Sequence, residues 1–275
     1  MTQDNRDPIA AFESEKTDRV QDYGLDQEWR RLSAAWLERA FARKYMYNFS
    51  WMGRPIIQTP VDMVAMQELI WQVKPDLIIE TGIAHGGSLI MNASMLAQLD
   101  YCDAVEQGRP LDPKATRRHV LGVDIDIRQH NLAAIQAHPM AHHIRMIQGS
   151  SVSAEIIAQV HALARGYKRV LVCLDSNHTH AHVLAELDAY APLTSAGSYC
   201  VVFDTIVEDL PADAFPDRPW KPGNNPKTAV REYLHSLDHQ HKNAADGQRL
   251  FLKIDHALEH KLMLSVAPEG YLLRP

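Results

Sequence analysis

The sequence predicts an α/β fold built on a mostly parallel, seven-stranded sheet, with helices on both faces and an antiparallel pair of strands at one edge. Between residues 77 and 204, short runs that are apolar almost throughout alternate with helical segments. Strands of this kind are typical of a parallel sheet covered on both faces. A glycine-rich turn and several acidic residues follow the strands, at the edge where open α/β sheets bind ligands.

The first part of the chain differs from this pattern. Residues 1–24 are polar and are predicted to form a flexible arm, whereas residues 26–45 carry an apolar stripe at helical spacing. Residues 46–60 are rich in aromatic side chains and contain glycine and proline, which predicts a loop. We therefore expect an N-terminal arm and helix over residues 1–60, followed by one main domain over residues 61–275.

The main domain begins with a predicted helix over residues 61–73. After it we expect strands at 77–81, 120–124, 144–148, 170–175 and 198–204, and helices at 82–99, 128–137, 153–164 and 180–190. Residues 100–118 are polar and predict a loop insertion. Residues 205–227 contain five prolines and predict an irregular lid. Residues 249–255 and 261–275 each contain a strand-like run, and the two can form the antiparallel edge pair.

The composition excludes several classes of protein. No apolar run approaches the ~18 residues of a membrane span, and the polar N-terminus lacks the apolar core of a signal peptide. These features predict a cytoplasmic protein with no membrane span. A net charge of −6 disfavours nucleic acid as a partner, because that binding depends on neutralising phosphates. Three cysteines without a CxxC pair argue against a disulfide framework and against a cysteine-rich zinc site.

A glycine-rich turn, ETGIAHGGS, occupies residues 80–88 after the first strand of the main domain. Gly82, Gly86 and Gly87 allow a ligand to approach the backbone closely, and the helix that follows offers free N–H groups to an anionic group. The spacing fits neither GxGxxG nor GxxxxGK[ST], so a dinucleotide or a nucleoside triphosphate is not the first choice. The alternative is a turn whose glycines are needed only for packing.

The next two strand ends predict a nucleoside site. Asp124 ends the second strand, where a carboxylate can accept both ribose hydroxyls of a nucleoside. Its alternative role is that of a helix N-cap. Ser150 and Ser151 follow the third strand in a small polar turn that can line an adenine pocket.

Two further carboxylates end the fourth and fifth strands. Asp175 and Asp204 should converge if these strands are neighbours, and they then repel each other unless a cation or a proton lies between them. Their hard oxygen ligands suit Mg²⁺. The alternative is that each of them caps a helix.

The run HTHAH at residues 178–182 invites a zinc interpretation. Only residues three or four apart share a helix face, so His178, His180 and His182 point in different directions if a helix begins here, which argues against a three-histidine site. His178 follows Asp175 by three residues and has the near-neutral pKa range that suits a general base. His180 and His182 are predicted to be solvated or to cap the helix.

With these motifs, the chain resembles the cephalosporin hydroxylase/rhamnosyl O-methyltransferase family of class I S-adenosylmethionine-dependent methyltransferases. The resemblance runs from about residue 45 to the C-terminus, and the segments ETGxxxGGS and LDSNHTHxHV are specific in combination. The segments that carry it are residues 48–70, 80–90, 121–128, 174–205 and 262–274. It implies a Rossmann-like methyltransferase domain over residues 61–275.

The resemblance also implies roles for individual residues. The residues it places around S-adenosyl-L-methionine are Glu80, Gly82, His85, Gly86, Ser88, Asp124, Ser150, Ser151 and Asp175. Asp175 and Asp204 match Mg²⁺ ligands of the family. With the argument from position given above for His178, the expected catalytic residues are Asp175 and His178. One residue departs from the family pattern, because Phe203 stands where a glutamate precedes Asp204, and one potential ligand is therefore missing.

The expected function is that of a Mg²⁺-assisted O-methyltransferase acting on a hydroxyl group of a sugar or of a natural-product scaffold. The amphipathic helix over residues 26–45 favours a homo-oligomer. One alternative is a hydroxylase or oxidoreductase accessory protein, although the sequence shows no clear 2-His-1-carboxylate iron set and no flavin fingerprint. Another is a catalytically silent cofactor-binding protein of a biosynthetic pathway, which Phe203 favours.

Overall fold

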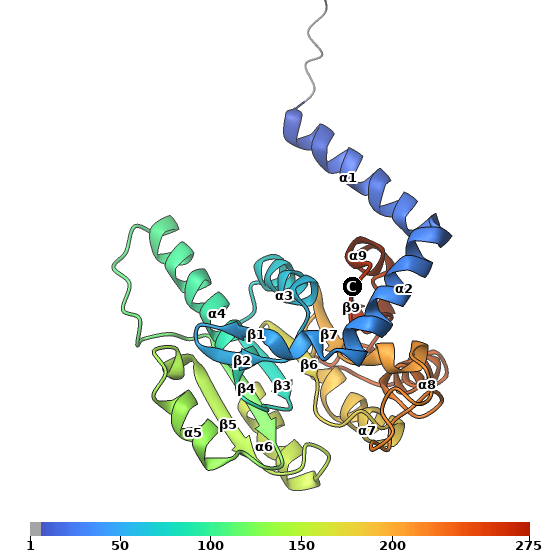
Figure 1. Ribbon diagram of the computed structural model, residues 1–275. Helices are drawn as coiled ribbons and strands as arrows, with labels where there is room; N and C mark the ends of the chain where they lie inside the picture. The colour runs from blue at the N-terminus through green and yellow to red at the C-terminus, as the bar shows by residue number, and fades with distance from the viewer. Residues whose placement is uncertain (1–6) are drawn as a thin grey trace, which may run out of the picture.

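The protein is described by a computed structural model that places residues 7–275. Its centre is a seven-stranded sheet with the strand order β5-β4-β3-β6-β7-β9-β8 (Figure 1). The strands from β5 to β7 are parallel, and β9 runs antiparallel to both β7 and β8, which confirms the predicted sheet and its edge pair. The strands are β3 (Leu77–Thr81), β4 (His119–Asp124), β5 (Ile144–Gln148), β6 (Val170–Leu174), β7 (Ser198–Val202), β8 (Lys253–Ile254) and β9 (Tyr271–Arg274).

Helices cover both faces of this sheet, as predicted. One face packs against α3 (Pro60–Val73), α4 (Gly87–Glu106), α5 (Gln129–Gln136) and α9 (His256–Leu262), and the other against α6 (Ala154–Ala164), α7 (His180–Tyr190) and α8 (Pro226–His239). Successive side chains along each strand point to opposite faces of the sheet, so each strand contributes to both hydrophobic cores. Ile78 and Leu171 face the first core, whereas Ile79 and Val172 face the second. Burying such a side chain stabilises the fold by about 1.5–3 kcal/mol.

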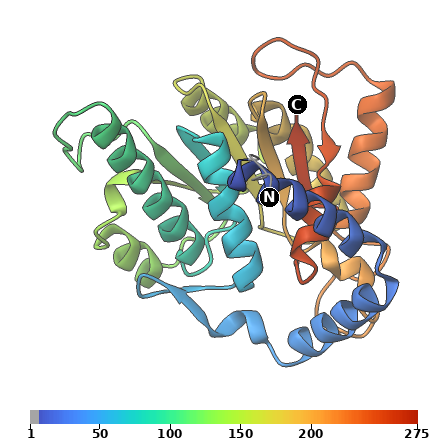
Figure 2. The ribbon, with the colours of Figure 1, turned by 90° about the horizontal axis from the view of Figure 1, so that it is seen from above.

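The predicted flexible arm is wrong for the described part of residues 1–24. Pro8–Leu25 form helix α1, whose N-terminus is capped by the Asp7 carboxylate accepting from the Ile9 N–H. The expectation for residues 1–6 lies outside the described residues. Helix α1 buries none of its side chains, and in Figure 1 it extends away from the body of the protein. The amphipathic helix expected next is α2 (Gln27–Ala42). Figure 2 shows both helices on the side of the sheet formed by β8 and β9.

The predicted loop over residues 46–60 contains a β-hairpin instead. A short 3₁₀ turn, η1 (Tyr45–Asn48), leads into β1 (Phe49–Trp51) and β2 (Arg54–Ile56), which pair antiparallel. The two turn residues, Met52 and Gly53, both have positive φ (45° and 84°), as the tight turns of two-residue hairpins require. A Cβ atom on Gly87 would lie 2.2 Å from the Pro55 carbonyl oxygen, so the hairpin rests directly on the start of α4.

Three further boundaries differ from the predictions. Helix α4 continues to Glu106, so only residues 107–118 of the predicted insertion form a loop. Strand β8 is two residues long, and the run expected to be a strand from residue 261 begins within α9, leaving only Tyr271–Arg274 as β9. The lid begins with a 3₁₀ turn, η4 (Thr205–Asp209), and is irregular from there to α8. Two other 3₁₀ turns are η2 (Ala141–His143) and η3 (Ala191–Leu193). Within residues 7–275, no helix is both long and apolar enough to span a membrane.

Candidate active site

The glycine-rich turn packs tightly against its neighbours at the carboxyl edge of the sheet. A Cβ atom on Gly82, where φ is 88°, would lie 2.1 Å from the Asp175 carbonyl oxygen, and one on Gly86 would lie 2.5 Å from the Ile135 side chain. Ala84, between them, adopts a left-handed φ of 45°. Left-handed conformations of non-glycine residues cost free energy and concentrate at functional sites. Packing thus requires these glycines, whichever ligand the turn meets.

Glu80 lies under this turn and is almost completely buried. Its carboxylate accepts hydrogen bonds from the hydroxyl of Ser88 and from the side-chain amide of Asn92 (2.9 Å). Burial outweighs these bonds and raises the pKa of Glu80 to about 7. Glu80, Asp62 and Asp175 line one small cavity together. A buried carboxyl group at this pKa is well suited to a cationic ligand, because a nearby positive charge favours its ionised form.

Asp62 is a site residue that sequence reasoning missed. It is completely buried on α3, and its carboxylate accepts hydrogen bonds from the Tyr271 hydroxyl (2.7 Å), the Ser265 hydroxyl (2.6 Å) and the Val266 N–H (2.9 Å). Burial raises the pKa of Asp62 above its usual value despite these bonds. A signal was available, because Thr59 is an N-cap residue type three residues before Asp62, and its hydroxyl accepts from the Asp62 N–H.

Asp124 holds the glycine-rich turn rather than a helix. Its carboxylate accepts from the N–H groups of Ile83 (2.7 Å), Ala84 (3.3 Å) and Asp126 (3.0 Å). The N-cap of the following helix, α5, is Arg128, so the alternative role of Asp124 as a cap is excluded. The predicted ribose acceptor therefore lies in contact with the turn predicted to bind the rest of the cofactor.

The hairpin fixes the same turn from the opposite side. The guanidinium of Arg54 donates to the His85 carbonyl oxygen (2.9 Å) and to the side-chain oxygen of Asn131 (2.9 Å). The Asn131 amide in turn donates to the Ala84 carbonyl oxygen (2.9 Å). The peptide groups of residues 84 and 85 are therefore held by side chains from β2 and α5, two contacts that the sequence did not reveal.

His182 contacts the turn that is predicted to line an adenine pocket. Ser150 and Ser151 follow β5, and the Ser151 hydroxyl lies 3.1 Å from Nε2 of His182. The same nitrogen lies 3.2 Å from the Ser176 hydroxyl and 3.5 Å from a carboxylate oxygen of the fully buried Glu186. The prediction that His182 is solvated or a cap is therefore wrong, because its side chain joins the ends of β5 and β6.

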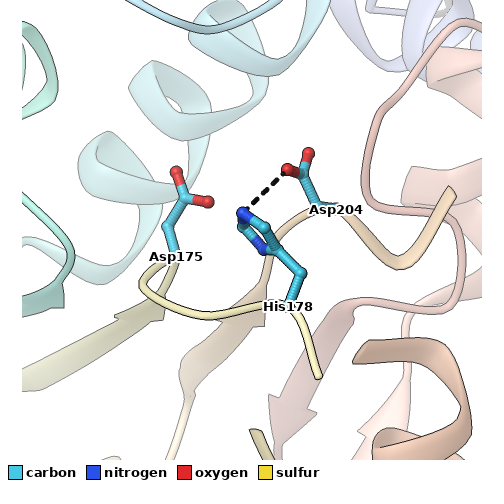
Figure 3. A group of neighbouring side chains, drawn as sticks. All are labelled: Asp175, His178 and Asp204. Atoms are coloured by element: carbon cyan, nitrogen blue, oxygen red, sulfur yellow. Dashed lines mark ion pairs between the residues drawn. The ribbon is translucent and has the colours of Figure 1, made fainter. Parts of the chain in front are cut away.

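Asp175, His178 and Asp204 form the centre of the site (Figure 3). Each offers one ligand atom, and these three atoms lie within 4.8 Å of one another. Nε2 of His178 is 3.3 Å from Oδ2 of Asp204. The predicted convergence of the two carboxylates is thus confirmed.

Neither side chain caps a helix. The N-cap of α7 is Thr179, which excludes Asp175. Asp204 occupies the N-cap position of the 3₁₀ turn η4 with a left-handed φ of 56°, but its side chain makes no capping hydrogen bond. Burial raises the pKa of Asp175 well above its usual value, and the negative charges of Asp204 and Glu80 raise it further. A divalent cation would offset this repulsion, and the two carboxylates supply the hard oxygen ligands that fit Mg²⁺.

Phe203 does not take part in this group. Its side chain is 6% exposed and packs in the core facing α3 and α4, along the cavity that Glu80 lines. The nearby acidic residues of the lid are also engaged elsewhere. Glu208 accepts from the Gly223 N–H (2.7 Å) and from Asn225, while Asp209 pairs with Lys227.

His180 also differs from its prediction. Its ring nitrogens lie 2.8 Å from the Thr228 hydroxyl and 3.1 Å from the Glu232 carboxylate, so it joins α7 to α8 instead of being solvated or capping. Within residues 7–275, the group of potential metal ligands contains His178 but neither of the other two clustered histidines. The prediction that the three histidines point in different directions agrees with their separate contacts.

Comparison with known proteins identifies the family that the sequence motifs resemble. Residues 43–275 match the family described as rhamnosyl O-methyltransferase/CmcI. A rhamnosyl O-methyltransferase of Mycobacterium leprae is 29% identical, with 82% of this chain and 82% of the relative covered. One of Mycobacterium tuberculosis is 27% identical, with 84% of this chain and 82% of the relative covered. A solved structure of CmcI with magnesium and S-adenosylmethionine shares the fold, with a TM-score of 0.51, 17% identity, and coverage of 83% of this chain and 77% of that one. The predicted fold and enzyme class are confirmed, and the chain belongs to the rhamnosyl O-methyltransferase/CmcI family.

Proposed function

We propose that this protein transfers the methyl group of S-adenosylmethionine to a hydroxyl group of a sugar or of a sugar-bearing natural product, with the assistance of Mg²⁺. The observation that carries the proposal is the convergence of Asp175, His178 and Asp204 beside the turn after β3. The relatives named rhamnosyl O-methyltransferases support a sugar acceptor.

In this proposal the cofactor lies along the carboxyl edge of β3, β4 and β5. Gly82, His85, Gly86 and Ser88, with the buried Glu80, would hold its methionine end. Asp124 would hold the ribose, and Ser150 and Ser151 the adenine. The sulfonium carries a positive charge, which would favour the ionised forms of the Asp62, Glu80 and Asp175 carboxyl groups in the cavity. Asp175 therefore contributes to cofactor binding as well as to the reaction.

Asp175 and Asp204 would hold Mg²⁺, an ion that commonly keeps several water ligands in proteins. When bound, the ion lowers the pKa of the acceptor hydroxyl and orients it. Nε2 of His178 lies next to Asp204 and takes the hydroxyl proton. Asp204 favours the imidazolium that this transfer produces, because an opposite charge stabilises the protonated ring. The chain's contribution is mainly alignment, since the oxygen must approach the methyl carbon from the side opposite the sulfur.

The second candidate function is that of a silent cofactor-binding protein, and the burial of Phe203 is the observation that favours it. The two candidates agree on cofactor binding but differ in turnover. Calorimetry with S-adenosylhomocysteine, with and without Mg²⁺, tests binding. Incubation with isotopically labelled S-adenosylmethionine and a panel of rhamnosides and other glycosides tests transfer. Tight binding without label in any glycoside favours the silent protein, whereas labelled product supports the methyltransferase.

We also propose that helix α2, in the N-terminal arm and helix over residues 1–60, serves self-association and that residues 61–275 form the methyltransferase domain. Trp29, Leu32 and Trp36 share one face of α2, since they are three and four residues apart, and their side chains are 40%, 52% and 40% exposed. A second copy of this chain would cover the face. Light scattering should show a dimer or larger assembly, and Leu32→Glu should shift it toward the monomer. An unchanged mass in that variant would contradict this role for α2.

A further inference from the structure

One aromatic side chain of the lid lies beside the reaction centre without a role in the chemistry described so far. The ring of Trp220 is 4.8 Å from the ring of His178, centroid to centroid, and nearly perpendicular to it (88°). His178 in turn contacts Asp204. An acceptor whose hydroxyl reaches His178 therefore has to place the atoms next to that hydroxyl close to the indole.

The lid holds Trp220 in place before any acceptor arrives. Lys221 and Asn224 pair through their backbones in a tight turn directly after it. The Asn224 side chain donates to the Pro219 carbonyl oxygen (2.9 Å) and accepts from the N–H of His180 (3.0 Å), at the start of α7. The segment that carries the indole is therefore tied to the helix that follows the reaction centre. Such preorganisation reduces the entropy lost when a ligand binds.

The electrostatics of the centre select against an anionic acceptor. Asp175 and Asp204 both direct carboxylates at the centre, and two negative charges there repel an anionic acceptor. The indole of Trp220 offers a large apolar surface whose ring face carries partial negative charge. The weakly positive C–H hydrogens of a sugar ring pack favourably against such a face. The Arg218 guanidinium lies over the same ring, 5.1 Å from its centroid, and steadies it by a cation–π contact.

We propose that Trp220 is the platform on which a neutral pyranose ring stacks, with its C–H face against the indole and one ring hydroxyl directed at His178. This inference rests on the proposed methyl transfer to a sugar and adds the residue that selects the sugar ring. It assigns the lid a role in acceptor recognition that is separate from cofactor binding.

The test uses saturation-transfer NMR on the full-length protein loaded with S-adenosylhomocysteine and Mg²⁺. The probe is methyl α-L-rhamnopyranoside, and catechol serves as a flat aromatic competitor. The variants are Trp220→Ala and Trp220→Phe. The matched control is Trp71→Ala, because Trp71 is half exposed, carries its own cation partner in Lys74 (4.7 Å), and lies at the end of α3 that leads into β3, away from the carboxyl edge of the sheet.

We expect the ring protons of the rhamnoside to receive saturation from the unmodified protein and from Trp71→Ala. Trp220→Ala should bind the sugar about five- to tenfold more weakly, and Trp220→Phe should lie between the two. Equal transfer in Trp220→Ala, no transfer to the rhamnoside from the unmodified protein, or displacement of the rhamnoside by catechol at lower concentration would each overturn the proposal. Calorimetry with S-adenosylhomocysteine separates the methyltransferase proposal from the Trp220 proposal. If the unmodified protein does not bind S-adenosylhomocysteine, the methyltransferase proposal is contradicted. If it binds S-adenosylhomocysteine but gives no sugar signal, only the Trp220 platform is contradicted.

Discussion

Nε2 of His178 lies 3.3 Å from Oδ2 of Asp204, although the two residues belong to different loops, which follow the neighbouring strands β6 and β7. The contact shows that the imidazole is aimed at the carboxylate pair and away from the other histidines of its cluster. His180 and His182, only two and four residues further on, point to α8 and to the ends of β5 and β6. Three similar side chains on one short segment thus have three separate surroundings.

The first prediction follows from this difference. His178→Ala should lower turnover by about 100-fold or more while leaving S-adenosylmethionine affinity nearly unchanged, because the variant loses only the proton acceptor. His180→Ala is the matched control and should retain most of the activity, since its contacts are with α8. Full activity in His178→Ala would show that solvent, and not His178, accepts the proton of the acceptor hydroxyl.

The second prediction concerns Phe203, which stands where the family pattern has a glutamate. Phe203→Glu should destabilise the protein by about 2–4 kcal/mol, because the new carboxylate enters a packed core without a partner. Phe203→Leu, which keeps an apolar side chain, should cost clearly less. Urea unfolding with and without Mg²⁺ measures both variants. A Phe203→Glu protein that is as stable as the unmodified one and binds Mg²⁺ more tightly would show that this side chain can turn to the metal.

The third prediction concerns the pH dependence of stability caused by Glu80. Its pKa is about 7 in the folded protein, above the value of about 4.5 expected after unfolding, so the folded state holds the extra proton between these values. The contribution of Glu80 to stability is therefore complete below about pH 4.5 and is lost as the pH rises to about 7, a change on the order of 3 kcal/mol. Glu80→Gln keeps hydrogen-bonding partners for Ser88 and Asn92 but cannot ionise.

Denaturation at pH 5 and pH 8 tests this contribution. The gain in stability of Glu80→Gln over the unmodified protein should be larger at pH 8 than at pH 5. Binding of the cationic cofactor should also release protons near pH 7 from the unmodified protein, and fewer from the variant. Calorimetry in buffers of different ionisation enthalpy measures this release. An equal stability difference at both pH values would show that Glu80 is already ionised.

The fourth prediction separates the two roles of Asp124. Asp124→Ala should weaken S-adenosylmethionine binding by about 1.5–3 kcal/mol, because it removes a charged acceptor for two ribose hydroxyls. It also leaves the N–H groups of Ile83 and Ala84 without their acceptor, so some loss of stability should accompany it. Asp124→Asn retains an oxygen for the turn and should preserve stability better than affinity. Calorimetry and thermal unfolding of both variants provide the comparison, and unchanged affinity in Asp124→Ala would remove this residue from the cofactor site.

The sequence predicted the sheet well because its strands are apolar runs, a signal contained in each segment alone. It missed α1 because that helix buries no side chain and so shows no apolar stripe to detect. It missed the hairpin because Met52 and Gly53 are not a common pair for a tight turn.

Some residues of the site could be predicted from local sequence patterns and others could not. Asp175 and Asp204 were found because their places at strand ends are visible in the sequence. The setting of His182 depends on Ser151, 31 residues earlier, and that of Asp62 on Tyr271, 209 residues later. Such contacts are created by the order of the strands and leave no local pattern.

The close approach of Gly82 to the Asp175 carbonyl oxygen has a consequence for protein engineering. Main chain touches main chain at this point, so the loop that would carry the methyl donor and the loop that would activate the acceptor cannot shift independently. Any larger residue at position 82 would push apart the two partners of the reaction. A redesign toward new acceptors should therefore leave this junction intact and vary the lid between η4 and α8, where the chain is irregular and side chains can be exchanged without moving the sheet.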